Sequence, residues 1–203
     1  MHVPTLPTKD VSVMSFSDAL KMAREPQDYD EQKWLYVPPF YTEYRYILGT
    51  AGKDPLICIG INPSTAAPNA LDNTLKSVLR VAKNNGYDGF IMLNVYPQRA
   101  TDPDDMENER NAYLHTQNLD AFEYALSLSE SRAVWAAWGT IVERREYLIS
   151  CMSDMVRIGK AWGARWLTAG KRSKAGHPHH PLYLKADSPL EDFDIDAYID
   201  SMK

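Results

Sequence analysis

The chain has 203 residues, of which 44% are hydrophobic and 24% are charged, an ordinary composition for one globular domain. Its formal net charge of −5 argues against a protein that coats nucleic acid through a broad basic surface, although a local basic cleft is compatible with it. No apolar run approaches the length of a membrane span, and residues 1–10 lack the apolar core of a secretory signal, so we expect a cytoplasmic protein with no membrane partner, monomeric by default.

Residues 1–40 differ from the rest of the chain. They are rich in proline and contain only one weakly helical stretch, at residues 16–24. We expect a partly irregular N-terminal extension that packs on a single α/β domain spanning residues 41–203.

From residue 44 onward, short apolar runs alternate with segments of helical periodicity. The expected strands span residues 44–48, 55–61, 90–95, 132–138 and 164–168. The expected helices span residues 72–86, with Asp72 as N-cap, 105–130 and 141–158. Strands that alternate with helices form βαβ units, and nearly continuous apolar runs are typical of strands buried on both faces. The sequence therefore predicts a three-layer α/β/α fold with a mainly parallel sheet of four or five strands. Its site should lie beyond the carboxyl ends of the strands.

A polar turn follows the strand expected at 55–61 and begins with Gly60, which permits close approach of another group. Pro63 restricts the turn, which leaves the side chain of Asn62 free to point into a site. Ser64 and Thr65 offer hydroxyl and backbone N–H groups to an anion or a polarised water. The alternative is a tight loop whose hydroxyls satisfy only local backbone groups.

The strand expected at 90–95 carries Asn94 inside an apolar run, where a buried amide needs hydrogen-bond partners. An amide can also recognise a donor and an acceptor on a base edge. In the loop that follows, Tyr96 is a candidate substrate contact and Arg99 a candidate phosphate ligand. The alternative has Asn94 bonded to loop backbone and Arg99 paired with Asp102 or Asp104.

The strand expected at 132–138 ends at Trp138, which is followed by a glycine that lets a helix begin close to the sheet. Trp138 is a candidate for the wall of a pocket, although we expect the Trp-Gly pair to serve mainly the packing of the helix against the sheet. The two cysteines, Cys58 and Cys151, lie in apolar runs, which predicts buried free thiols in a reducing compartment. They are too few for a zinc site with four cysteine ligands.

After the strand expected at 164–168, a basic segment contains His177, His179 and His180, three of the five histidines in the chain. A metal site, a structural loop and an active-site loop are the competing interpretations. Pro178 and Pro181 impose a stiff non-helical path with no nearby carboxylate or cysteine, which disfavours a metal. We favour an active-site loop, because histidine donates protons and hydrogen bonds near neutral pH and the other motifs converge on the same sheet edge. No metal or organic cofactor is expected.

The order of these motifs resembles the uracil-DNA glycosylase superfamily, most closely its mismatch-specific branch. The similar elements are Gly-Ile-Asn-Pro, Leu-Asn-Val with Pro-x-Arg and Asp-Pro, Trp-Gly, and His-Pro followed by Leu. Over residues 44–184 the chain also resembles the bacterial and phage family called domain of unknown function 1643. The matching segments are residues 44–46, 60–66, 94–103, 137–139 and 176–183.

The glycosylase resemblance implies a role for each matching residue. Asn62 would position the water that attacks the sugar C1′, and Asn94 would recognise the base edge. His180, or His177, would stabilise the departing base. Ser64 and Thr65 would bind a phosphate or polar group, and either Leu182 or Tyr183 would enter the base stack or belong to the core.

We therefore expect a glycosylase-like N-glycosidase that acts on a nucleobase, modified or not, in nucleic acid or in a free nucleotide. Cleaving this bond creates a positive sugar and an anionic base, so catalysis is mainly electrostatic and positional. A base within a duplex would have to be flipped into the pocket. The alternatives are a non-catalytic nucleotide- or nucleobase-binding module and a protein-interaction scaffold.

Overall fold

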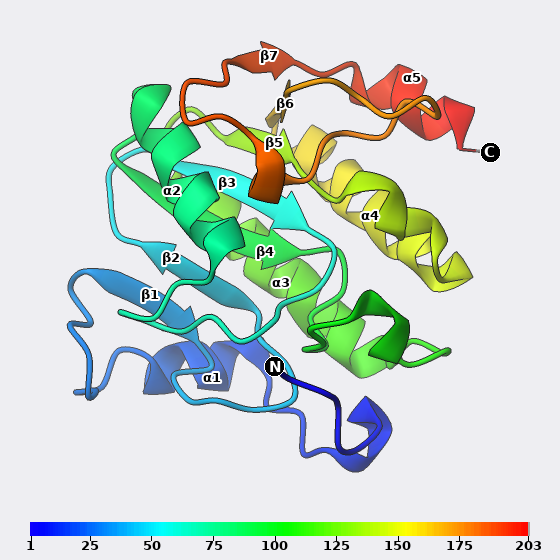
Figure 1. The fold of residues 1–203 in the computed structure, drawn as a ribbon. Coiled ribbons are helices and arrows are strands. Elements are labelled where there is room, and N and C mark those ends of the chain that lie inside the picture. Colours follow the sequence, from blue (N-terminus) through cyan, green and yellow to red (C-terminus); the bar gives the residue numbers. More distant parts are fainter. Residues whose placement is uncertain (203) are drawn as a thin grey trace.

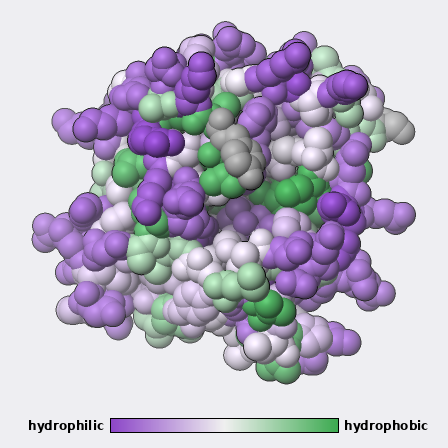
Figure 2. Space-filling model, viewed as in Figure 1, coloured by the Kyte–Doolittle hydropathy of each residue, from purple (hydrophilic) through white to green (hydrophobic). Residues whose placement is uncertain are grey.

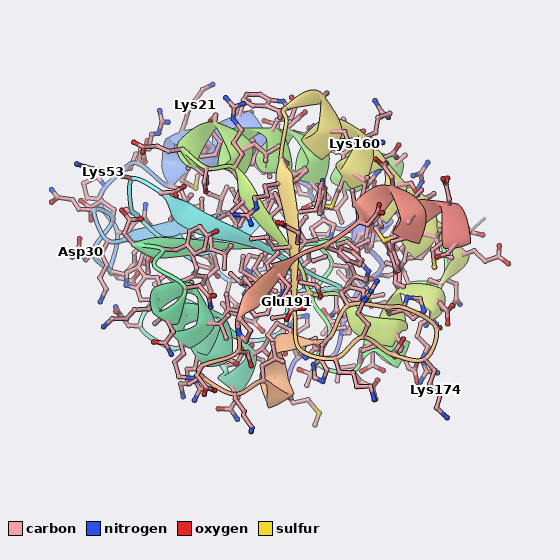
Figure 3. The ribbon with its side chains drawn as sticks, turned by 90° about the horizontal axis from the view of Figure 1, so that it is seen from above. Lys21, Asp30, Lys53, Lys160, Lys174 and Glu191 are labelled. Carbon is pink, nitrogen blue, oxygen red and sulfur yellow. The ribbon has the colours of Figure 1, made fainter. Side chains whose placement is uncertain are left out.

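The computed structural model describes residues 1–202, and the side chain of Tyr183 lies outside its described part. One seven-stranded mixed sheet lies between two helical layers (Figures 1 and 3). The strands are β1 Trp34–Val37, β2 Ile47–Thr50, β3 Pro55–Gly60, β4 Gly89–Asn94, β5 Ala133–Ala136, β6 Arg165–Ala169 and β7 Leu190–Asp192. The α-helices are α1 Phe16–Met22, α2 Asn73–Asn84, α3 Ala112–Leu128, α4 Glu146–Ala161 and α5 Ile195–Ser201.

The strand order is β1-β2-β4-β3-β5-β6-β7. The four central strands, β4, β3, β5 and β6, are parallel, as the alternation of strands and helices predicts. The expected total of four or five mainly parallel strands is wrong, because antiparallel strands extend both edges: β1 and β2 beside β4, and β7 beside β6. These edge strands have three or four residues each, too few to establish a clear periodicity in the sequence.

The strand expected at 44–48 begins later, at Ile47. Upstream of it, the Arg45 N–H donates to the Pro97 carbonyl at 2.9 Å, and Tyr44 forms an isolated bridge with Gln98. Residues 44 and 45 therefore pair with the loop after β4, and this places Arg45 at the carboxyl end of the sheet.

The two faces of the sheet have separate apolar cores. Helices α1, α3, α4 and α5 cover one face, whereas α2 covers the other (Figure 3). Cys151 belongs to the first core and Cys58 to the second, and both are buried free thiols, as predicted. Among the described helices, none is long and apolar enough to span a bilayer.

The helix boundaries follow the capping residues. The Asp72 side chain accepts a hydrogen bond from the Leu75 N–H, which confirms the predicted N-cap of α2. The helix expected from residue 105 begins at Ala112, because Asn111 provides the N-cap and the preceding polar segment forms only a 3-10 turn, Pro103–Asp105. The helix expected at 141–158 corresponds to α4. It begins later, at Glu146, because the residues before it form a 3-10 segment, Gly139–Glu143.

Residues 1–40 supply one helix, α1, and one strand, β1, to this fold. Trp34 to Val37 pair in register with Thr50 to Ile47. The Phe16 N–H donates to Gln117 Oε1 on α3 at 2.6 Å. The extension thus completes one edge of the sheet and part of one helical layer.

Candidate functional site

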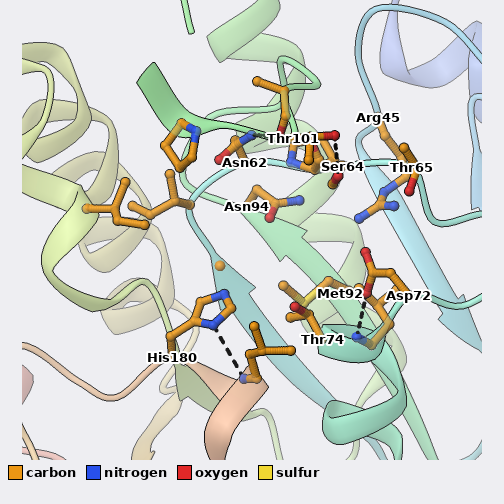
Figure 4. A pocket seen from close by; sticks show the side chains of 18 of the residues that line it. Arg45, Asn62, Ser64, Thr65, Asp72, Thr74, Met92, Asn94, Thr101 and His180 are labelled. Carbon is orange, nitrogen blue, oxygen red and sulfur yellow. Dashed lines mark hydrogen bonds between the residues drawn. The ribbon is translucent and has the colours of Figure 1, made fainter. Parts of the chain in front are cut away.

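A cavity of about 580 Å³ lies at the carboxyl ends of β3 and β4 (Figure 4). The two strands end level with each other, since Gly60 is the register partner of Asn94. Residues from distant parts of the chain line the cavity: 60–65, 72–75, Met92, Asn94, Ala100, Thr101, Pro103, His180, Leu182, Arg45 and Ile141. Figure 2 shows the same side of the molecule, hollowed near its centre, with hydrophilic residues at the bottom of the hollow.

Asn62 is half-buried and its amide is anchored on one side. Its Nδ2 donates to the carbonyl of Ala100 at 2.7 Å and to that of Pro63 at 3.2 Å. Because both hydrogen bonds use the nitrogen, the rotation of the amide is restricted and Oδ1 stays available as an acceptor. No described residue donates to Oδ1, so a water or a ligand can do so.

Asn94 is buried at the end of β4. Its amide nitrogen donates to the backbone carbonyls of Asn62 at 3.2 Å and Leu93 at 3.3 Å when the amide is oriented to satisfy its surroundings. The backbone carbonyl of Asn94 accepts a hydrogen bond from Asn118 Nδ2 of α3 at 2.8 Å. The amide oxygen is then the atom left to face the cavity.

Gly60 leaves the space that this arrangement needs. A Cβ atom there would lie 3.0 Å from a terminal amide atom of Asn94 and 2.6 Å from the methyl of Met92.

His180 faces the two asparagines from the C-terminal loop (Figure 4). The Leu182 N–H donates to its Nδ1 at 3.3 Å, so the neutral imidazole carries its proton on Nε2. Burial, and next the charge of His179, lowers the pKa of His180. The ring is therefore a neutral N–H donor near pH 7. Ser77 of α2 holds the adjacent backbone, since its Oγ donates to the Pro181 carbonyl at 2.7 Å.

A family model described as "Protein of unknown function (DUF1643)" matches residues 45–182. The chain belongs to the DUF1643 family. The matched segment begins and ends with cavity residues, Arg45 and Leu182, and contains every described residue that lines the cavity. Neither a curated protein nor a solved structure matches the chain.

Seven of the predicted site residues of this DUF1643 protein line the cavity in addition to Asn62. They are Gly60, Pro63, Ser64, Thr65, Asn94, His180 and Leu182. They come from the end of β3 and the loop after it, from the end of β4, and from the short 3-10 segment η4, Pro181–Tyr183, with its flanking histidine. The side chain of Tyr183, another predicted contact, is outside the described residues.

Arg99 does not reach the cavity, although it was the predicted phosphate ligand. Its guanidinium is buried behind the 62–66 loop, where it donates to the Ser64 carbonyl and, at 3.0 Å, to the Tyr36 hydroxyl. It also stacks over the Tyr41 ring at 4.3 Å. Arg99 therefore holds the loop in place from behind.

Tyr96, Trp138, His177 and His179 also lie outside the cavity lining. The Tyr96 hydroxyl bonds to Glu107 and accepts from the Asn111 N–H. A second cluster lies near α5. Tyr198 accepts a hydrogen bond from Trp138 Nε1 at 3.0 Å and lies 2.9 Å from His177 Nδ1.

His177 is 1% exposed, and its Nε2 is 3.2 Å from Glu143 Oε1. His179 is half-buried, with its Nδ1 2.7 Å from the His180 carbonyl. Of the three clustered histidines, the cavity therefore receives only His180. No described cluster of three or more histidine, cysteine or carboxylate side chains could hold a metal ion.

Sequence reasoning missed several lining residues, chiefly Arg45, Asp72, Thr74 and Thr101. Arg45 gave a signal, since it is a charged residue within an aromatic and apolar run. Asp72 was recognised only as a helix cap, and nothing in the local pattern separates the two threonines from ordinary loop residues.

Proposed function

We propose that this protein hydrolyses an N-glycosidic bond and releases a nucleobase from a nucleotide or a nucleic acid. One observation carries the proposal: Asn62 from the loop after β3, Asn94 at the end of β4 and His180 from the C-terminal loop line one cavity. Each presents a polar atom that no described residue occupies. The cavity volume also lies within the usual range for small-molecule sites, about 300–1,000 Å³.

In the proposed reaction Asn62 orients the attacking water. Its anchored amide leaves Oδ1 to accept a hydrogen bond from the water, whose oxygen then faces the sugar C1′. An amide is a poor base, so the attack depends on the positive charge that develops on the sugar. The C1′–N bond breaks with its electron pair on the base and a C1′–O bond forms. One proton of the water stays on the new C1′ hydroxyl, and the other passes to the base directly or through the solvent.

His180 and Asn94 would hold the departing base. The Nε2–H of a neutral His180 donates to a base oxygen and stabilises the negative charge that develops there. The free oxygen of Asn94 accepts from a ring N–H. Together they match a base edge that presents a carbonyl beside an N–H, such as the lactam edge of uracil.

Turnover tests the proposal directly. The protein, near stoichiometric amounts, is incubated with oligonucleotides that contain uracil, mismatches or modified bases, and with free nucleotides. Abasic sites or free base are then quantified. We expect release of lactam-edged bases, and an Asn62→Ala variant should lose at least about a hundredfold in rate, the typical cost of a misplaced reacting group.

Asn84→Ala is a matched control. It removes a similar amide–carbonyl hydrogen bond, from Asn84 Nδ2 to the Ala186 carbonyl, at the far end of α2. It should cleave at the wild-type rate. Absence of product from every substrate contradicts the proposal. Saturable binding without product instead supports a non-catalytic base-binding module.

A further inference from the structure

The cavity has a second polar end, opposite His180, at which Arg45 is the central residue (Figure 4). Arg45 is 1% exposed, and its guanidinium points into the space between Thr65 and Asp72. Its Nη1 donates to the Ala66 carbonyl at 3.1 Å. Its Nε is buried without a partner, and no described residue accepts from Nη2. The planar guanidinium of Arg45 therefore faces the cavity with most of its N–H donors lacking an acceptor.

No carboxylate neutralises this arginine by an ion pair within the described residues. The arginines that pair with carboxylates are at least 40% exposed: Arg110, Arg144, Arg157 and Arg165. Arg45 and Arg99 are instead both buried and lie close enough that the charge of one lowers the pKa of the other. Burial is the larger cause, and the pKa of Arg45 falls to about 9. An unpaired buried charge is costly, so a bound anion would stabilise this arrangement.

The N-terminus of α2 opens at the same end of the cavity. Asn73 and Thr74 line the cavity, and their backbone N–H groups donate to no described residue. The aligned peptide dipoles of this helix add a partial positive charge there. The hydroxyls of Thr65 and Thr74 supply further donors.

Asp72 is the only carboxylate among the described lining residues, and it opposes anion binding. One of its oxygens is occupied as the N-cap, by the Leu75 N–H at 2.9 Å. The Arg45 guanidinium and the helix N-terminus, with the buried charge of Arg99 behind the 62–66 loop, outweigh this one carboxylate, so this end of the cavity has net positive charge.

We infer that the Arg45 end of the cavity binds a phosphate group of the ligand, with the fork of Arg45 and the first N–H groups of α2 as its donors. The inference rests on the proposed function for the identity of the attached nucleoside. The substrate class it names is a nucleoside that carries a phosphate, either as a free nucleotide or as part of a nucleic acid chain.

Phosphate binding is measurable without turnover. Inorganic phosphate is titrated into the protein at constant ionic strength, with chloride as the reference, and the melting temperature and binding heat are followed. We expect saturable binding by the wild type, weakened about tenfold or more in Arg45→Met and also weakened in Arg45→Lys, which keeps the charge but not the fork. Arg132→Met is the matched control, because Arg132 is exposed and donates to the Trp162 carbonyl at 2.8 Å, outside the cavity. Phosphate binding that is absent, or equal in wild type and Arg45→Met, overturns the inference.

Asp72→Asn gives an independent readout if the Arg45 variants fold poorly. Asparagine caps helices as well as aspartate does, so α2 should remain intact. Removal of the negative charge should tighten phosphate binding about three- to tenfold, as expected for one charge a few ångströms away that is screened by water. Unchanged or weaker binding contradicts the inference.

A last comparison separates the two sources of phosphate. A deoxynucleoside, its 5′-monophosphate and a short single-stranded oligonucleotide are compared for affinity. Tighter binding of the monophosphate identifies a free nucleotide, and tighter binding of the oligonucleotide identifies a nucleic acid chain. Equal affinity for all three overturns the phosphate site, whether or not any of them is cleaved.

Discussion

Gly60→Ala tests the close approach of β3 to Asn94, on which the Asn94 end of the cavity depends. The added Cβ would lie 2.6 Å from the Met92 methyl and 3.0 Å from the Asn94 amide, whereas carbon atoms in favourable contact are about 3.5–4.0 Å apart. The methyl ends a flexible side chain and can move aside. The Asn94 amide is tied to two backbone carbonyls, so its displacement costs those hydrogen bonds.

Extra methyl groups in packed cores typically cost about 1–3 kcal/mol, and the lower entropy of an unfolded alanine recovers about 0.4–1 kcal/mol. We expect Gly60→Ala to lose about 1–2 kcal/mol of unfolding free energy, which is a fall of roughly 2–8 °C in melting temperature for a chain of this size. Differential scanning calorimetry measures the change.

Addition of Met92→Leu to Gly60→Ala separates the two contacts. The shorter leucine removes the clashing methyl, so the double variant should recover stability. The Asn94 side-chain amide resonances should stay displaced, and turnover should stay low. A Gly60→Ala protein as stable as the wild type, with unshifted Asn94 resonances, would refute the reasoning.

Three further outcomes are expected. Ser77→Ala, which removes the hydroxyl that holds the Pro181 carbonyl, should lower the unfolding free energy by about 1 kcal/mol in urea titrations; no loss contradicts the tether. An NMR titration should give His180 a pKa below its ordinary value of 6.5. Because the unfolded chain then binds the proton more tightly, His180 contributes to the unfolding free energy above pH 6.5, and this contribution is lost as the pH falls through the folded-state pKa. The His180→Gln variant should lack this pH-dependent part of the unfolding free energy. Asn62→Asp turns a carboxylate toward the Ala100 carbonyl and should cost about 1–3 kcal/mol at pH 7; wild-type stability there would show that the amide is not anchored as described.

Local sequence pattern predicted the central part of the fold for a clear physical reason. A strand covered on both faces must be apolar throughout, so β3, β4 and β5 stand out as continuous apolar runs. The edge strands β1 and β7 are short and antiparallel, and β7 buries no side chain fully, so no comparable signal marks them. The strand β2 was expected in part, from the aromatic and apolar run at 44–48. The start of α3 was misplaced because a cap, not periodicity, determines it.

The convergence of Asn62, Asn94 and His180 on one cavity was also predictable. Parallel strands end at the same edge of a sheet, so polar residues that follow them come together whatever the details of the loops. The carboxyl-end rule placed the loops correctly without any knowledge of their conformation.

The sequence by itself thus determined which segments line the cavity. The pattern of apolar residues shows which strands are buried and in which direction each of them runs. Only the tertiary structure decided which of several identical side chains enters the cavity. His180 faces the cavity whereas His177 is enclosed beside α5, and Arg45 lines the cavity whereas Arg99 lies behind the 62–66 loop. The direction of a side chain depends on its local turn and on neighbours up to a hundred residues away, such as Ser77 beneath Pro181, and no short pattern records those contacts.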